Sequence, residues 1–171
     1  MLPARFPRHA IFAVLTVVIA IGASGCKALR LSPTGPSTVD APLDLEAELA
    51  FCAQEVNRLR ATVGAPALVR SSRVESFSMD AARVDGEAHE AHRHFRATNG
   101  GHGASMAQNE IPWWKLSQWG SVREVVRKGL AMQWAEGAGG GHYDNMLRNH
   151  SEVGCGIAVI SGEVTVTQDF R

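Results

Sequence analysis

Three stretches of the chain repeat apolar side chains at intervals of three and four residues, the spacing of a helix with one buried face. Ser72 with Glu75 and Ser121 with Glu124 form capping-box patterns at the start of the second and third stretches. Asn99-Gly100-Gly101 ends the second stretch. The pattern predicts three amphipathic helices with these apolar stripes: Leu45, Leu49, Cys52, Val56, Leu59 and Val63; Val74, Phe77, Ala81, Val84, Ala88, Ala91 and Phe95; Val122, Val126, Leu130 and Trp134.

Near the end of the chain the apolar positions alternate instead, which is the period of a half-buried strand. Val153–Ile160 and Glu163–Phe170 both show this alternation. Ser161-Gly162 separates them and has the length and composition of a two-residue hairpin turn. Helices followed by a hairpin indicate an α+β fold in a single domain.

Two cysteines fall on faces that these patterns predict to be buried. Cys52 lies on the stripe of the first helix, and Cys155 shares the inward face of the first hairpin strand with Val153 and Ile157. In an exported protein such a pair indicates a disulfide, which we favour here. Two buried free thiols are the alternative, because cysteine is a common core residue.

The first 25 residues resemble a bacterial lipoprotein signal peptide. Arg5 and Arg8 precede the apolar run Ala10–Ile21, which is shorter than the roughly 20 residues that span a membrane. Ala23-Ser24-Gly25 then stands directly before Cys26, which would become the lipidated N-terminus. Ordinary secretion is the alternative, and both interpretations place the protein outside the cytoplasm.

Residues 26–43 are rich in Pro, Ser, Thr and Gly, a composition typical of a tether, and 44–171 form the predicted domain. We therefore expect a membrane-anchored lipoprotein of the bacterial cell envelope. Without residues 1–25 the chain has 15 basic and 17 acidic side chains, a net charge of −2. Nucleic-acid binding needs a basic surface, so we expect no nucleic-acid partner.

A glycine-rich turn connects an acid with a histidine. Glu136 ends the third predicted helix, Gly137–Gly141 turn the chain, and His142 follows. A carboxylate is disfavoured at a helix C-terminus because the macrodipole is negative there. The pattern suits either a cleft that both side chains face or a plain helix stop with a flexible turn.

The residues around this turn carry a family resemblance. Gly-His-Tyr at 141–143, Asn-Met-Leu at 145–147 and Val-Gly-Cys-Gly-Ile at 153–157 resemble the C-terminal signature of the CAP superfamily. That superfamily contains cysteine-rich secretory proteins, antigen 5 and plant pathogenesis-related proteins, and the bacterial branch is the most similar. The resemblance covers residues 45–171 and is most specific at 134–157. It implies a three-layer α-β-α sandwich with a small, mostly antiparallel sheet.

A second part of the resemblance lies at His102 and Ala107-Gln108-Asn109, where the family has a histidine followed by Gly-Glu-Asn or Ala-Glu-Asn. Gln108 therefore stands at the position of the family acid. Glu110 would restore the charge by a shifted register, although neighbouring side chains of an extended segment point to opposite sides.

The resemblance implies a cleft of two histidines and two acids, which binds a divalent metal in some members. The corresponding residues here are His102, Gln108, Glu136 and His142, with Glu110 and His94 as auxiliary candidates. Two imidazoles and one carboxylate match a zinc shell with an open position. We expect weak binding of zinc or another divalent metal that needs both histidines. A structural role, with a buried imidazole hydrogen-bonded to a glutamate, is the alternative.

Two further groups of side chains have a structural and a functional interpretation. Three tryptophans either fill the core beneath a loop or form a contact surface for a lipid or protein partner: Trp113, Trp114 and Trp119. The resemblance adds lipid or sterol binding, which is reported in parts of the family. Of the histidines near the end of the second helix, we expect His89 and His92 to be solvated and keep His94 as the cleft candidate.

Two functions of different classes follow. The first is a tethered binding or interaction module for an unknown protein or lipid ligand, with no turnover. The second is a metal-assisted hydrolase acting on peptides or cell-envelope material. The missing acid argues against the second, and so does the absence of a nucleophile: Cys155 lies inside a strand, and the sequence has no Gly-x-Ser-x-Gly elbow. We therefore favour the binding module.

Overall fold

Four strands form one mixed sheet at the centre of the domain. They are β1 (Val69–Arg70), β2 (Ala107–Lys115), β3 (Glu152–Ile160) and β4 (Glu163–Phe170). The spatial order is β1-β3-β4-β2, with β1 parallel to β3 and the other two pairs antiparallel. The predicted hairpin is confirmed as β3 and β4, and the sheet is mostly antiparallel as expected.

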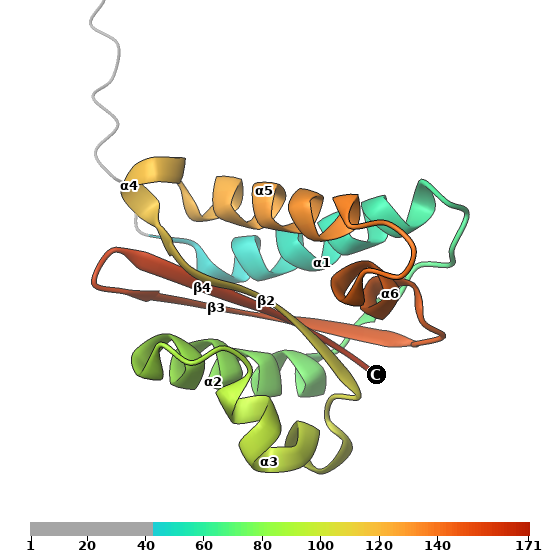
Figure 1. Ribbon diagram of the computed structural model, residues 1–171, viewed down its shortest axis with the longest axis horizontal. Coiled ribbons are helices and arrows are strands. Elements are labelled where there is room, and N and C mark those ends of the chain that lie inside the picture. The colour runs from blue at the N-terminus through green and yellow to red at the C-terminus, as the bar shows by residue number, and fades with distance from the viewer. Residues whose placement is uncertain (1–42) are drawn as a thin grey trace, which may run out of the picture. The chain divides into compact units, whose positions relative to one another are not determined.

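The computed structural model describes residues 43–171, so the expected signal peptide, the lipidation site Cys26 and the tether up to residue 42 lie outside the described residues. Helices cover both faces of the sheet, which confirms the three-layer α-β-α sandwich (Figure 1). One layer contains α1 (Leu45–Ala61), α4 (Leu116–Trp119), α5 (Val122–Ala135) and α6 (Gly141–Leu147). The other contains α2 (Ser72–Ala88) and α3 (Arg93–Gly103).

Between residues 43 and 171, no helix combines the length and the apolar character needed to span a membrane.

The two predicted capping boxes have different outcomes. The Ser121 hydroxyl accepts the backbone N–H of Glu124 at 3.2 Å, as expected for the start of α5. At the start of α2 the box does not form, because Ser71 is the N-cap residue and makes no side-chain capping bond. Glu75 instead pairs with Arg70 at 2.7 Å and so links α2 to β1.

The second predicted helix is wrong as a single element, because the chain breaks it between α2 and α3. His89 and His92 both have positive φ, so the helical path is interrupted at each of them. Two buried carboxylates stabilise the new start: Glu110 accepts the N–H of His92 at 2.6 Å, and Asp85 accepts that of His94 at 2.7 Å. The first N–H groups of a helix have no hydrogen-bond partner within the helix, and Glu110 and Asp85 each accept one of them.

The two faces of the sheet have different chemistry. The face toward α1 and α5 packs an apolar core, with residues such as Ile157, Val164, Val166 and Phe170 buried on it. The face toward α2 and α3 buries polar side chains instead: Ser78, Asp85, Gln108, Glu110, Thr165, Thr167 and Asp169. The α1–α5 side therefore supplies most of the hydrophobic stabilisation, and the α2–α3 side contains the buried carboxylates Asp85, Glu110 and Asp169.

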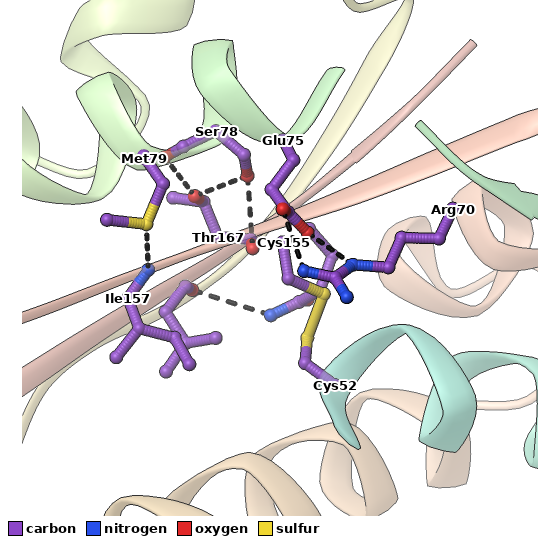
Figure 2. Close-up of a disulfide and its surroundings, with 10 residues drawn as sticks. Cys52, Arg70, Glu75, Ser78, Met79, Cys155, Ile157 and Thr167 are labelled. Atoms are coloured by element: carbon purple, nitrogen blue, oxygen red, sulfur yellow. Dashed lines mark hydrogen bonds and ion pairs between the residues drawn. A yellow bond between two sulfur atoms is a disulfide. The ribbon is translucent and has the colours of Figure 1, made fainter. Parts of the chain in front are cut away.

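The predicted disulfide is confirmed. Cys52 on α1 and Cys155 on β3 are bonded, and both are fully buried (Figure 2). A link between residues that are 103 positions apart restricts the unfolded chain and typically contributes about 2–4 kcal/mol.

On the opposite face of β3, α2 lies directly against the strand backbone. A Cβ on Gly154 would lie 2.2 Å from the Glu75 nitrogen, and one on Gly156 would lie 1.9 Å from the Ser78 carbonyl oxygen. Only glycine fits at these two positions. The Ser78 hydroxyl also contacts that of Thr167 at 2.8 Å, which connects α2 to β4 (Figure 2).

Candidate functional site

The glycine-rich turn brings Glu136 and His142 together. His142 Nδ1 lies 2.5 Å from Glu136 Oε1, and the His142 N–H donates to Glu136 Oε2 at 3.1 Å. Gly140 permits this approach, because a Cβ there would lie 2.4 Å from the Glu136 Cβ. The hydrogen bond with His142 lowers the pKa of Glu136. Both side chains are about a third exposed, at 36% for His142 and 35% for Glu136, and each is engaged with the other.

His102 does not join this pair in a cluster. It ends a left-handed turn, Asn99–His102, in which every residue has positive φ. Its side chain is exposed, and it makes no hydrogen bond or ion pair with any residue in the described part of the chain. Within residues 43–171, no three His, Cys, Asp or Glu side chains group together in a way that could hold a metal ion.

His92 is the histidine that contacts Gln108. His92 Nδ1 lies 2.9 Å from Gln108 Oε1, and the Gln108 amide nitrogen donates to both carboxylate oxygens of Asp169 at 3.1 Å. Gln108 and Asp169 are both buried, whereas the His92 side chain is 33% exposed. The amide that stands at the position of the family acid is thus engaged at both ends.

Glu110 lies on the same side of β2 as Gln108, because residues two apart on a strand share a face. Opposite sides are expected only for direct neighbours such as Gln108 and Asn109. That rule therefore does not place Glu110 on the other side of the strand from Gln108. Glu110 is 5% exposed, and its Oε2 lies 3.6 Å from His92 Nδ1 in addition to accepting the His92 N–H. Its carboxyl group therefore faces the interior beneath His92.

Asn109 faces the other way and connects β2 to α6. Its amide nitrogen donates to the His142 carbonyl oxygen at 2.9 Å. The Asn145 amide nitrogen donates to Asn109 Oδ1 at 3.0 Å and to the Gln108 carbonyl oxygen at 3.3 Å. These bonds hold the Gln108 end of β2 against α6. The His92–Gln108 contact and the Glu136–His142 pair therefore lie on adjacent elements.

A cavity of about 270 Å³ lies where α3, β2 and α6 meet. It is lined by His92, Phe95, Met106, Ala107, Gln108, Asn145 and Arg148. Phe95 and Met106 give it an apolar wall, and Met106 is 69% exposed. No acidic side chain lines the cavity, and Arg148 is its only permanent cation. We call it the His92–Arg148 pocket.

Three buried carboxylates lie behind this pocket. Burial, together with the nearby charge of Asp85, raises the pKa of Glu110 to about 7 and that of Asp169 to about 6. Burial likewise raises the pKa of Asp85. One oxygen of Asp85 and one of Glu110 have no hydrogen-bond partner among the described residues. At neutral pH this layer can therefore hold protons that exposed acids would have released.

The side chains that the resemblance implies do not fit a divalent metal in this arrangement. A zinc site with an open position needs three protein ligands that point to one centre. Glu136 and His142 are bonded to each other, the Gln108 amide is bonded to His92 and Asp169, and His102 is exposed. The available donors are consequently divided among separate contacts.

The three tryptophans lie around α4, where β2 ends. Trp114 and Trp119 stack at 4.6 Å and pack against the apolar core, while Trp113 stacks on His89 at 5.2 Å. A cavity of about 240 Å³ lies between them. Much of their aromatic surface is therefore used inside the protein.

His94, the other auxiliary candidate, packs its ring against Phe77 at 5.0 Å and does not line the His92–Arg148 pocket.

Sequence reasoning missed His92 and Asp169. The sequence pattern places His92 on a solvated helix face because it does not reveal the break after α2. The signal was available in part: His89-Glu90-Ala91-His92 follows a 17-residue helix and carries no β-branched or large aliphatic side chain. Asp169 lies on β4 between buried neighbours, on the face that also carries Thr165 and Thr167. Because Asp169 alternates with apolar residues along the strand, the sequence predicts a polar face there. The sequence does not indicate that this polar face is buried.

Comparisons with known proteins agree with this fold. The family model described as "CAP: Cysteine-rich secretory protein family" matches residues 53–170, and the chain belongs to this family. No curated protein matches the chain.

Two solved bacterial structures are similar in architecture. A cysteine-rich secretory protein from Staphylococcus aureus has a TM-score of 0.51 at 10% identity, over 77% of this chain and 40% of its own. An extracellular protein containing a SCP domain, from Bacillus anthracis, has a TM-score of 0.49 at 11% identity, over 74% and 41%. This chain spans about two fifths of the length of either neighbour. At these identities the first likeness supports the fold alone.

Proposed function

We propose that this chain is an exported, lipid-anchored CAP domain that binds a ligand in the His92–Arg148 pocket without turning it over. The signal-peptide pattern with Cys26 directly after Ala23-Ser24-Gly25 supports export and anchoring. Family membership supports a secreted setting, because the family is named for secretory proteins. Anchoring through Cys26 would hold the domain at the envelope by the tether at 26–43.

The engagement of Gln108 is the observation on which the binding role rests. An amide at this position takes no proton, and here it is already bonded to His92 and Asp169. The pocket consequently offers a ligand no free carboxylate that could act as a general base. Its remaining groups are a guanidinium, an imidazole, an amide and an apolar wall, which suit recognition of a polar ligand, and no Ser, Thr, Cys or Lys nucleophile from residues 43–171 lines the pocket beside the imidazole.

The competing function is a metal-assisted hydrolase, and zinc binding separates the two. We would titrate zinc by calorimetry into the mature chain carrying Cys26→Ser, and into the same chain carrying His142→Ala. A binding module gives heats that do not depend on His142, because no third His, Cys, Asp or Glu side chain within residues 43–171 joins Glu136 and His142 to complete a metal site.

The opposite outcome is equally clear. Stoichiometric zinc uptake that the His142→Ala variant loses would show that His142 is a metal ligand. It would replace the proposed binding role by the metal-dependent one.

A further inference from the structure

The protonation pattern of His92 follows from the buried residues behind it. Asp169 can only accept hydrogen bonds when ionised, and both of its oxygens accept from the Gln108 amide nitrogen. The amide oxygen of Gln108 must then face His92, at 2.9 Å from Nδ1. Glu110 Oε2, at 3.6 Å, is a second acceptor facing the same nitrogen. Nδ1 therefore carries the proton, and neutral His92 keeps its lone pair on Nε2.

The Nε2 lone pair is available to a ligand. It makes no hydrogen bond or ion pair with any residue from 43 to 171, and the ring lines the His92–Arg148 pocket. Its chemistry selects a hydrogen-bond donor, such as a peptide N–H or a hydroxyl group. The chain Asp169–Gln108–His92 thus makes Gln108 a positioning residue that fixes which ring nitrogen the ligand meets.

Arg148 favours an anion in the ligand, whereas His92 Nε2 favours a hydrogen-bond donor. Its guanidinium forms no ion pair with the carboxylates of the described residues, and it lies at the end of α6 on the rim of the pocket. A guanidinium without a partner, in a pocket that no acid lines, favours an anion and binds carboxylates in a two-pronged geometry. Phe95, Met106 and Ala107 provide an apolar surface between the two polar contacts.

We infer that the His92–Arg148 pocket binds the C-terminal residue of a peptide that ends in an apolar side chain. Arg148 takes the terminal carboxylate, His92 Nε2 accepts the N–H of the same residue, and the side chain lies against Phe95 and Met106. The pocket, with a volume of about 270 Å³, has room for the side chain of one residue. This inference rests on the proposed function, since it names the ligand class of the same pocket.

Three small probes separate the contacts. N-acetyl-leucine has the carboxylate, the N–H and the apolar side chain; N-acetyl-leucinamide lacks the charge; and N-acetyl-N-methyl-leucine lacks the N–H. We would titrate each into the ¹⁵N-labelled mature chain carrying Cys26→Ser and follow chemical shifts by NMR. N-acetyl-leucine is expected to bind at least about tenfold more tightly than the other two, because each loses one polar contact.

Two arginine variants test the anion contact. Arg148→Gln should weaken N-acetyl-leucine at least about tenfold. Arg73→Gln should leave its affinity unchanged, since Arg73 is an exposed arginine on α2 that likewise has no ion-pair partner within residues 43–171. Equal binding of N-acetyl-leucine and its amide, or full affinity in Arg148→Gln, would overturn the carboxylate assignment.

The ring of His92 gives an independent readout. Its ¹⁵N chemical shifts at pH 8 should show the Nδ1–H tautomer, and an Nε2–H ring would overturn the positioning role of Gln108. Failure of this inference differs from failure of the proposed function. Binding of acid and amide with equal affinity at these residues would leave a binding module of another specificity. Zinc-dependent cleavage of the N-acetyl bond would instead replace the proposed function itself.

Discussion

Replacement of Glu110 by glutamine tests the polar layer between the sheet and α2–α3. The Glu110 side chain is 1% exposed, its Oε1 has no partner, and burial raises its pKa from 4.5 to about 7. The folded state therefore retains a proton that the unfolded state has already lost between these two pH values. The contribution of Glu110 to the free energy of unfolding is complete below about pH 4.5, falls as the pH rises, and is lost above about pH 7.

The size of this effect follows from the shift. Each pKa unit corresponds to about 1.4 kcal/mol, so a rise from 4.5 to about 7 amounts to about 3 kcal/mol. Glutamine has the same shape, is neutral at every pH, and its amide oxygen can accept the His92 N–H. An NH₂ group at the unpartnered Oε1 position would cost about 1 kcal/mol, but equally at every pH. The pH-dependent change in the free energy of unfolding can thus be separated from the pH-independent cost of the substitution.

The assay is urea unfolding of wild type and Glu110→Gln at pH 4.5 and pH 8, with the disulfide intact. Between the two pH values the variant should gain about 3 kcal/mol relative to wild type. Glu87→Gln is the matched control, because Glu87 is 55% exposed and pairs with Arg83 on the surface. It should show almost no pH-dependent difference. If Glu110→Gln changes the unfolding free energy by the same amount at both pH values, the raised pKa of Glu110 is refuted.

Two further predictions concern the glycine contact of α2 and the anchor. Gly156→Ala should lower the unfolding free energy in urea by about 3 kcal/mol or more, because its Cβ would lie 1.9 Å from the Ser78 carbonyl oxygen; near-native stability would contradict that contact. Gly141→Ala is its control and should be close to neutral, since nothing lies within 4 Å of the added Cβ. Cys26→Ser should move the protein from the membrane to the soluble fraction of fractionated cells, and a variant that stays membrane-associated would rule out lipidation.

Helical and strand periodicity predicted most of the fold because each element of the α1–α5 layer has one apolar face. The stripe with Cys52 and the alternation around Cys155 indicated faces that meet, and the disulfide joins them. The same method predicted one helix from 72 to about 98, because Ala88, Ala91 and Phe95 continue the apolar spacing. It could not detect the break, which is stabilised by bonds from Asp85 and from Glu110 on β2, far away in the sequence.

The candidate site was predictable only where it is local. Glu136 and His142 are separated by a short glycine turn, and their approach could be expected from the spacing. His92 and Gln108 come from different elements, and their contact depends on the break that positions α3. The family pattern led to His102 because it precedes the Ala107-Gln108-Asn109 motif closely. The left-handed turn at 99–102 instead leaves its side chain exposed.

The replacement of the family acid by Gln108 has a physical reason in Asp169. A glutamate at position 108 would place its carboxylate where the amide nitrogen now lies, 3.1 Å from both oxygens of Asp169. Two carboxylates this close do not both ionise, so one would keep a proton. Burial already raises the pKa of Asp169 to about 6, and Glu110 and Asp85 add like charge nearby. The amide removes one charge from this group and supplies the donor that Asp169 needs. Its oxygen is then directed to His92, so the residue that relieves the buried repulsion also determines the chemistry of the pocket.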